Sequence, residues 1–153
     1  MKITDFLDAA RIIPNLKGKD KRDALTEMSD WLASQDPTLD AKKLLETLLE
    51  REKIISTAIG EGVAIPHGKM PGLRKVSGLF ARSPQGVNFD SLDGGPTYLF
   101  FVLVAPEDSA ADHLKALARI SRLLKDGSFR ARLMEGNTRE EIFNVIQEED
   151  QKF

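Results

Sequence analysis

The segment spanning residues 98–104 constrains the fold most strongly, because every residue in it is apolar or aromatic. It reads Tyr-Leu-Phe-Phe-Val-Leu-Val, with no alternation between apolar and polar positions. A strand with one face in water alternates, whereas an uninterrupted apolar strand is typical of one that is covered on both faces. We therefore expect a central strand here, with helices on both sides of its sheet.

Other short apolar runs, broken by glycine and proline, predict the neighbouring strands of this sheet. Residues 62–65 and 76–81 have this texture. Residues 11–16 form a shorter run that contains Pro14, and a proline in a strand favours an edge position. The predicted fold class is α/β, with a central mixed sheet of about five strands and helices on both faces.

Apolar residues at spacings of three and four predict the helices. Residues 19–34 and 40–52 show this pattern and are separated by Asp36-Pro37. Residues 109–125 show it again, opened by Ser109 as a cap. The core-facing residues expected in this third helix are Leu114, Leu117, Ala118, Ser121 and Leu124. Shorter helices are predicted at residues 3–10, 129–134 and 139–148.

Length and composition indicate one domain, residues 1–153, with a single core. A net charge of −2 makes nucleic acid a poor candidate partner. The absence of cysteine excludes disulfides, thiolate metal sites and cysteine nucleophiles. The longest apolar run is too short to cross a bilayer, and acidic residues interrupt the start of the chain where a signal peptide would be apolar. We expect a cytoplasmic protein without direct membrane insertion.

The chain has two histidines, His67 and His113, and the residues alone leave the role of each open. His67 lies in a Pro-His-Gly turn after a predicted strand, which suits either an aimed imidazole or an incidental surface residue. His113 lies in the first turn of a predicted helix, where anions bind well, yet it also suits a solvent-facing position beside Asp112. Arg51, near a helix end, is either a solvated charge or a two-pronged phosphate ligand.

Patterns for other chemistry are missing. The sequence contains no GxxxxGK[ST] loop, no GxGxxG after a strand and no HExxH. Neither Ser56 nor Ser77 lies in a GxSxG elbow, so a serine hydrolase is not indicated. No spacing of potential ligands suggests a metal site.

Residues 51–68, REKIISTAIGEGVAIPHG, resemble the phosphorylation-site motif of phosphotransferase-system enzyme IIA proteins of the mannitol, fructose and nitrogen-regulatory group. The resemblance continues through Val-Asn-Phe-Asp at 87–90, the strand at 98–104 with the following Ala-Pro, and Asp-His-Leu at 112–114. It therefore covers nearly the whole chain. One departure is Ala58, where glycine is common in nitrogen-regulatory members.

The resemblance implies that His67 accepts a phosphoryl group from an HPr-like phosphocarrier protein and passes it to an acceptor. Arg51 and His113 match the family's two supporting positions. Ser56, Thr57 and the backbone at Gly68 rank second, as substrate-binding groups. No cofactor, nucleotide or metal is implied, because donor and acceptor are phosphorylated proteins. An apolar ring around His67 is expected for such transient partners, from Ile65, Met70 and Leu73, unless these side chains are buried.

Three hypotheses for the biological role remain at this stage. The chain stands alone, and the segments at 89–94 and 105–108 are more similar to those of nitrogen-regulatory members, which favours a regulatory phosphocarrier acting on target proteins. The alternative is a transport component that donates phosphate to a IIB component during fructose or mannitol uptake. A third is a binding module that uses the fold without phosphorylation.

Overall fold

The sheet is centred on β6 (Thr97–Pro106), the strand expected from its unbroken apolar run. The structure is a computed structural model that describes residues 1–153. β5 (Ser77–Val87) runs antiparallel to β6, and β1 (Ile12–Ile13) lies parallel to β5 at the sheet edge. On its other side β6 pairs in parallel with both β3 (Val63–Ala64) and β4 (His67–Met70), and β2 (Ala58–Gly60) completes the order β1-β5-β6-β3-β2. The predicted mixed sheet is confirmed, with six strands.

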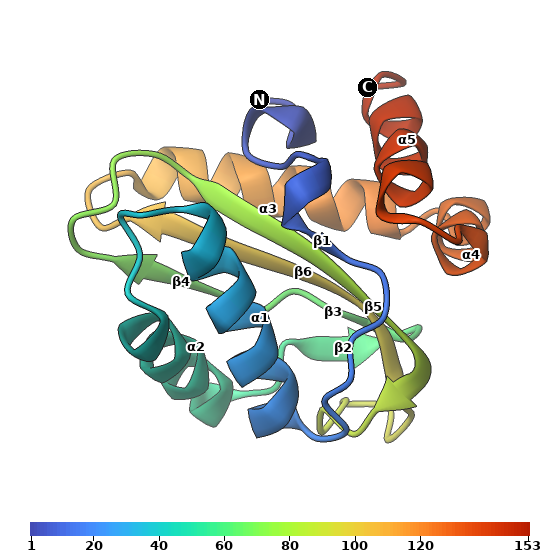
Figure 1. Ribbon diagram of the computed structural model, residues 1–153, viewed down its shortest axis with the longest axis horizontal. Helices are drawn as coiled ribbons and strands as arrows, with labels where there is room; N and C mark the ends of the chain where they lie inside the picture. The colour runs from blue at the N-terminus through green and yellow to red at the C-terminus, as the bar shows by residue number, and fades with distance from the viewer.

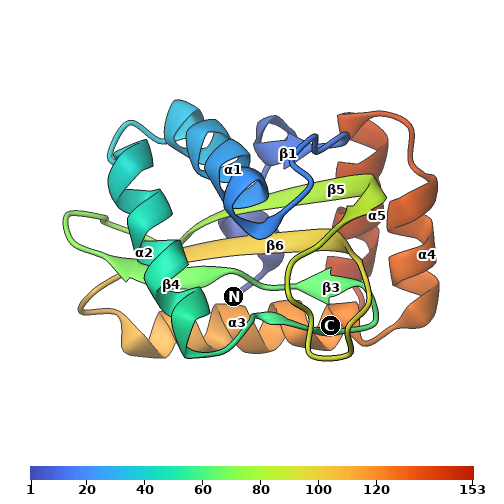
Figure 2. The same cartoon turned by 90° about the horizontal axis from the view of Figure 1, so that it is seen from below.

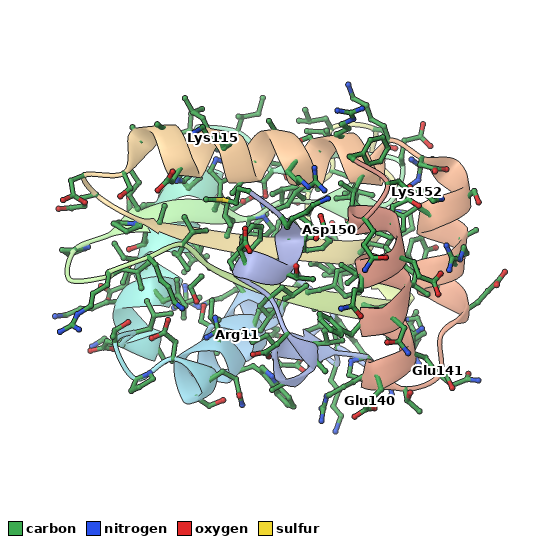
Figure 3. The ribbon with its side chains drawn as sticks, turned by 90° about the horizontal axis from the view of Figure 1, so that it is seen from above. Arg11, Lys115, Glu140, Glu141, Asp150 and Lys152 are labelled. Carbon is green, nitrogen blue, oxygen red and sulfur yellow. The ribbon has the colours of Figure 1, made fainter.

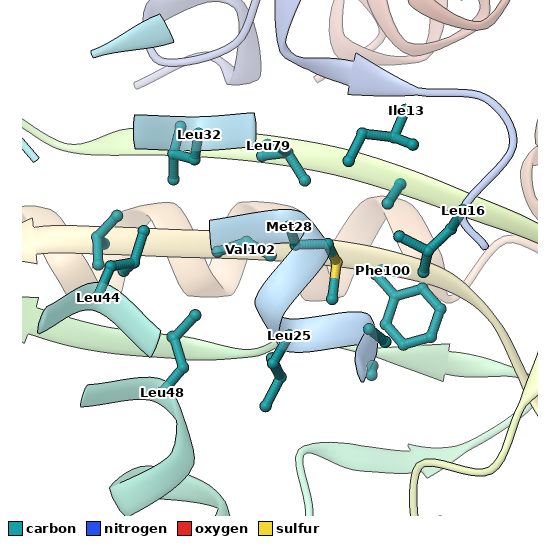
Figure 4. Packing of buried hydrophobic residues seen from close by; sticks show 14 of the residues in the cluster. Ile13, Leu16, Leu25, Met28, Leu32, Leu44, Leu48, Leu79, Phe100 and Val102 are labelled. Atoms are coloured by element: carbon teal, nitrogen blue, oxygen red, sulfur yellow. The ribbon is translucent and has the colours of Figure 1, made fainter. Parts of the chain in front are cut away.

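Helices cover both faces of this sheet, as predicted (Figures 1 and 2). One face carries α1 (Lys21–Gln35) and α2 (Ala41–Ile54). The other carries α3 (Ala110–Leu124), with α4 (Gly127–Glu135) and α5 (Arg139–Asp150) beyond it. The side chains of β6 alternate between two separate clusters of buried apolar residues, with Phe100 and Val102 in one and Phe101 and Leu103 in the other. The apolar run is unbroken because both faces of β6 are buried, each in its own core. Figure 4 shows one of these cores.

The two helices on the α1 face begin where their sequences provide a cap. The Asp20 carboxylate accepts a hydrogen bond of 2.8 Å from the backbone N–H of Asp23, and Asp40 caps α2 in the same way through Lys42 and Lys43. Such caps satisfy backbone N–H groups that lack an intrahelical partner. Ser109 occupies the N-cap position of α3, as predicted, but its side chain makes no capping hydrogen bond.

The predicted core face of α3 is only partly right: Leu124 is buried and Leu117 packs against the core, but Ala118 is exposed and Ser121 is half-buried. Leu114 is 67% exposed, and the buried residues of the helix are His113, Ala116, Ile120, Leu123 and Leu124. A shift of one residue rotates the face by about 100°. The sequence offers apolar residues on both stripes, and packing against β6 selects the stripe that contains His113. The consequence is a buried histidine and an exposed leucine on adjacent positions.

The helix predicted at residues 3–10 is also wrong. This segment forms two single 3₁₀ turns, η1 (Ile3–Asp5) and η2 (Ala9–Arg11), because the backbone leaves helical geometry at Phe6, whose carbonyl oxygen accepts a hydrogen bond of 3.0 Å from the N–H of Gly78 on β5. Only Ile12 and Ile13 of the strand predicted at 11–16 pair with β5, at the predicted edge. No helix of the structure has the length and apolarity needed to span a membrane.

Candidate functional site

An open cleft of about 790 Å³ lies where α2, β4 and the start of α3 meet. β4 contributes His67, Gly68 and Lys69, and the last turns of α2 contribute the wall that contains Arg51. α3 contributes His113 from its first turn. The structure thus brings together His67, His113 and Arg51, which are far apart in sequence. The remaining lining residues are Thr47, Glu50, Lys53, Ile54, Ala110, Leu114 and Leu117.

His67 is the first residue of β4 and its imidazole is held by the backbone. The ring nitrogen Nδ1 lies 2.7 Å from the carbonyl oxygen of Ile65, which can only accept a hydrogen bond. Nδ1 therefore carries the proton in the neutral ring, and the lone pair is on Nε2. β4 pairs with β6, with His67 opposite Leu103, so the central strand fixes the position of the backbone beneath the ring.

His113 lies beside His67, with the ring centroids 5.5 Å apart and the planes inclined at 74°. It is 5% exposed, so the solvent-facing alternative for this residue is excluded. Its Nδ1 atom is buried without a hydrogen-bond partner. A buried N–H without a partner costs about 1–3 kcal/mol, so the tautomer with the proton on Nε2 is favoured. His113 therefore presents an N–H donor to the cleft.

Both imidazoles are held in the neutral form. Burial is the main cause that lowers the pKa of His67, and the Arg51 guanidinium lowers it further, against the opposing effects of the Ile65 carbonyl and Glu52. Burial also lowers the pKa of His113, with additional contributions from His67 and Lys69. A neutral imidazole has a free lone pair, so His67 Nε2 is available as a nucleophile near neutral pH.

The cleft has positive charges that carboxylates do not fully neutralise. Arg51 uses one guanidinium nitrogen to donate to the Ile55 carbonyl oxygen at 2.9 Å and forms no ion pair. Lys53 is paired with Glu50 at 2.7 Å. Lys69 has neither a hydrogen bond nor an ion pair, and it shares the side of β4 that carries His67, since alternate residues of a strand face the same way. An anion near His67 Nε2 would find donors from three elements.

Gly68 allows α2 to lie directly against β4. A Cβ atom added at this position would be 2.7 Å from Cγ2 of Thr47 on α2, closer than any ordinary van der Waals contact. Because Arg51 is one turn beyond Thr47, this close approach also brings the backbone of Arg51 near β4. Gly68 lines the cleft, as expected from the sequence.

The structure does not bring Ser56 and Thr57 to the cleft. Ser56 Oγ donates to the Phe89 carbonyl oxygen at 2.9 Å. Thr57 is buried, and its hydroxyl donates to the Glu52 carboxylate at 2.5 Å. Both hydroxyl groups therefore serve the turn that follows α2.

The apolar rim of the cleft also differs from the expected one. Met70 and Leu73 belong to the core on the α1 face, which was the alternative considered for them, and Ile65 is half-buried. The exposed apolar side chains at the cleft are Ile54 and Leu114, which are 78% and 67% exposed. Apolar groups next to polar chemistry suit the docking of a protein.

Two charged residues near the site, Lys69 and Glu52, were not identified from the sequence. Lys69 would have followed from predicting β4, since it shares a strand face with His67. Glu52 had a separate signal, because it continues the buried stripe of Leu44 and Leu48 at a spacing of four and so places a carboxylate on the core side of α2.

The chain matches one protein family over almost its full length. Residues 5–149 match the family described as phosphoenolpyruvate-dependent sugar phosphotransferase system, EIIA 2. A nitrogen regulatory protein of Bradyrhizobium diazoefficiens is 45% identical over 146 residues, which are 95% of each chain. The fructose-specific EIIABC component of Bacillus subtilis is 37% identical over 150 residues, which are 98% of this chain and 24% of that longer protein.

Solved structures agree with these matches. The nitrogen regulatory protein IIA-Ntr from Neisseria meningitidis is similar with a TM-score of 0.87 and 32% identity, over 94% of this chain and 98% of that one. Enzyme IIA of the Escherichia coli mannitol system, solved in complex with phosphorylated enzyme IIB, has the same fold, with a TM-score of 0.77 and 22% identity over 93% and 97% of the two chains. The resemblance inferred from residues 51–68 is confirmed.

Proposed function

Because the chain belongs to the EIIA 2 family of the phosphoenolpyruvate-dependent sugar phosphotransferase system, we propose that it is a histidine phosphocarrier that accepts its phosphoryl group on Nε2 of His67. The observation that carries this proposal is the hydrogen bond from His67 Nδ1 to the Ile65 carbonyl. It leaves a lone pair on the other nitrogen, in a cleft with several unpaired donors.

The donor in this proposal is the phosphohistidine of an HPr-like phosphocarrier protein. His67 Nε2 attacks phosphorus, and a new N–P bond forms while the N–P bond of the donor breaks and its electron pair returns to the donor imidazole. Positive charge that develops on the His67 ring is stabilised by the hydrogen bond to the Ile65 carbonyl. The exposed side chains of Ile54 and Leu114 provide apolar contact for the donor protein.

Donors around the cleft would stabilise the charge on the transferring oxygens. The free guanidinium nitrogens of Arg51 suit two-point binding of a phosphoryl group. His113 would donate from Nε2, and Lys69 would add an unpaired positive charge on the same side of β4. Positioning and charge stabilisation are the main requirements of phosphoryl transfer, so these side chains supply the necessary chemistry.

On the acceptor side, we propose a regulatory phosphocarrier whose phosphorylation changes which target proteins it binds. The support is the 45% identity to a nitrogen regulatory protein, with 95% of both chains aligned. A phosphoryl group brings about −1.5 to −2 charges, enough to change binding at a cleft rim. The alternative, transfer to a IIB component in sugar uptake, is supported by the 37% identity to a fructose-specific component.

The test is to incubate the purified protein with phosphoenolpyruvate, enzyme I and an HPr-like protein and to follow its mass. We expect an increase of one phosphoryl group that is labile in acid and stable in base, as for a phosphohistidine. The variant His67→Ala should gain none, whereas the control Ser128→Ala, at an exposed position of α4 outside the cleft, should be modified. Modification of His67→Ala, or none in the wild type, would overturn the proposal.

Adding a purified IIB component to the phosphorylated protein distinguishes the two roles. Rapid loss of the phosphoryl group to a IIB cysteine would favour the transport role. If the protein is never phosphorylated and His67→Ala binds its partners normally, a binding module would be the better description.

A further inference from the structure

Glu52 is a buried carboxylate next to Arg51 in the wall of the cleft, and it has no part in the proposed transfer step. Its side chain is only 3% exposed. It accepts hydrogen bonds from the hydroxyl and the backbone N–H of Thr57, at 2.5 and 3.0 Å. Lys21 of α1 lies 3.3 Å from the same carboxylate and also 3.5 Å from Asp90. Glu52 thus connects α1, α2 and the turn after α2.

From Thr57 the connection continues to His67 through one backbone hydrogen bond and one from the His67 side chain. The Thr57 carbonyl oxygen accepts from the N–H of Ile65 at 3.3 Å. The Ile65 carbonyl oxygen in turn accepts from His67 Nδ1 at 2.7 Å. These hydrogen bonds, joined through the backbones of Thr57 and Ile65, therefore connect the carboxylate of Glu52 to the ring that would take the phosphoryl group.

Glu52 is also adjacent in sequence to Arg51, another residue of the cleft. Arg51 precedes Glu52, and its guanidinium is held by the carbonyl of Ile55. The segment between Arg51 and Thr57 is therefore fixed at both ends, by the α2 backbone and by the hydrogen bonds between Glu52 and Thr57. A movement of this segment would displace Arg51 and the Ile65 carbonyl together.

We propose that Glu52 is a positioning residue for phosphoryl transfer, which through Thr57 holds the Ile65 carbonyl against Nδ1 of His67 and keeps Arg51 at the cleft. This inference rests on the proposed function of His67. A carboxylate that accepts charge-assisted hydrogen bonds fixes its donors more firmly than a neutral acceptor does. Lys21 compensates the buried charge, so the arrangement persists without an unpaired ion.

Removing one partner of a buried ion pair is itself destabilising, so the stability of each Glu52 variant must be measured separately from its effect on positioning. The position of Glu52 says more about its role than its contribution to stability does. It lies on the buried stripe of α2, where Leu44 and Leu48 occupy the preceding equivalent positions, yet it carries a charge. Its negative charge also opposes the lowering of the His67 pKa that burial and Arg51 cause.

Two variants test the proposal, each with a matched control. Glu52→Gln keeps the shape of the side chain and removes the charge, and Glu46→Gln makes the same change at an exposed position of the same helix, outside the cleft. Thr57→Val removes the hydroxyl and keeps the shape, whereas Thr57→Ser keeps the hydroxyl. Circular dichroism and thermal unfolding establish that each variant is folded before rates are compared.

Phosphorylation rates are measured at about pH 8, where His67 is neutral in every variant. We expect Glu52→Gln and Thr57→Val to lower the maximal rate by about tenfold to a hundredfold, without changing the KM for the phosphorylated donor, since only positioning is lost. Thr57→Ser should restore most of the rate, and Glu46→Gln should match the wild type. Equal rates in all four variants would overturn the proposal.

Nitrogen-15 NMR of the unphosphorylated protein provides a second measurement that does not depend on phosphoryl transfer. The wild type should show His67 mainly as the Nδ1–H tautomer, and Glu52→Gln should shift its ring-nitrogen signals and lower its pKa. An unchanged tautomer and pKa in both Glu52→Gln and Thr57→Val would contradict the positioning role. If the variants change the tautomer or pKa of His67 as expected, but the wild type is never phosphorylated, the proposed function of His67 would be contradicted instead.

Discussion

Two charged regions of the molecule, the cleft at His67 and a cluster around Asp150, contain similar side chains. They differ in whether those side chains have partners within the fold. We define the Asp150 cluster as Lys2, Thr4, Arg119 and Asp150, where η1, α3 and α5 meet (Figure 3). Arg119 Nε donates to Asp150 Oδ1 at 2.9 Å, and the N–H of Thr4 donates to the other carboxylate oxygen at 3.2 Å. Lys2 donates to the Asp150 carbonyl at 2.8 Å.

In the cleft, by contrast, the hydrogen-bond donors have few partners within the protein. Lys69 has no partner, Arg51 contacts a single carbonyl, and the side chain of His113 forms no hydrogen bond. Both regions include α3, which carries His113 in its first turn and Arg119 further along. A charge that is paired within the fold stabilises the fold, whereas a charge that is held without a partner is available to a ligand.

The largest expected effect is on stability, in the Asp150 cluster. Asp150→Asn leaves Arg119, whose side chain is 14% exposed, without its ion pair, and we expect the free energy of unfolding to fall by about 3 kcal/mol. Urea denaturation followed by circular dichroism measures this change. The folded variant should be phosphorylated at the wild-type rate, and a slower rate at full stability would show that the two regions are not independent.

The next effect concerns His113 and should appear in the rate of phosphorylation. His113→Ala removes a donor to the transferring oxygens, and we expect a rate about 10²-fold lower while His67 remains modifiable. His113→Gln, which can still offer an N–H to the cleft, should recover part of the loss. Single-turnover rates with the phosphorylated donor protein measure this effect. An unchanged rate in His113→Ala would show that this residue has no part in the mechanism.

A smaller effect is expected at Lys69, because the side chain is exposed and water screens its charge. Lys69→Met should lower the rate by about two- to fivefold, and the loss should shrink as salt is added. Lys115→Met is the control, since Lys115 is exposed on α3 outside the cleft. If both variants lose the same factor, the effect comes from overall charge and Lys69 has no special position.

The smallest expected effect is the response of the site to mild acid. The pKa of His67 and that of His113 are both lowered, so proton NMR titration should give midpoints below about 6.5 for both rings. Between about 6.5 and these midpoints the unfolded chain binds more protons than the folded one, so the free energy of unfolding should fall as the pH decreases through this range. Arg51→Gln should raise the midpoint of His67. A His67 midpoint at or above about 6.5 in the wild type would contradict the neutral nucleophile.

Most helices and the sheet could be predicted because their signals are local. Residues 98–104 required two apolar faces, and the spacing of Leu25, Met28 and Leu32 required α1. β4 was missed because its pairing with β6 joins residues more than thirty positions apart, and the sequence Pro-His-Gly-Lys has no strand pattern of its own. The face of α3 was predicted only in part, with Leu117 and Leu124 on the core side and Leu114 outside it, because two apolar stripes compete on that helix and packing against the sheet decides between them.

The candidate site could also be predicted only in part. His67, Arg51 and His113 were recognisable because a family motif carries them, and the structure brings all three to one cleft. The connection from Glu52 to His67 depends on distances between backbone groups, which no residue pattern encodes. The expected roles of Ser56 and Thr57 relied on their nearness in sequence to Arg51, but the turn after α2 directs their hydroxyl groups inward.

The contact between Gly68 and Thr47 limits how this chain can change over generations. Every residue type other than glycine would bring a Cβ within 2.7 Å of Cγ2 of Thr47. A mutation at 68 therefore requires the methyl group of Thr47 to move or to be removed. A smaller residue at 47 would relieve the contact, but with Gly68 still present it would leave a gap between helix and strand, so the effect of each change depends on the residue at the other position.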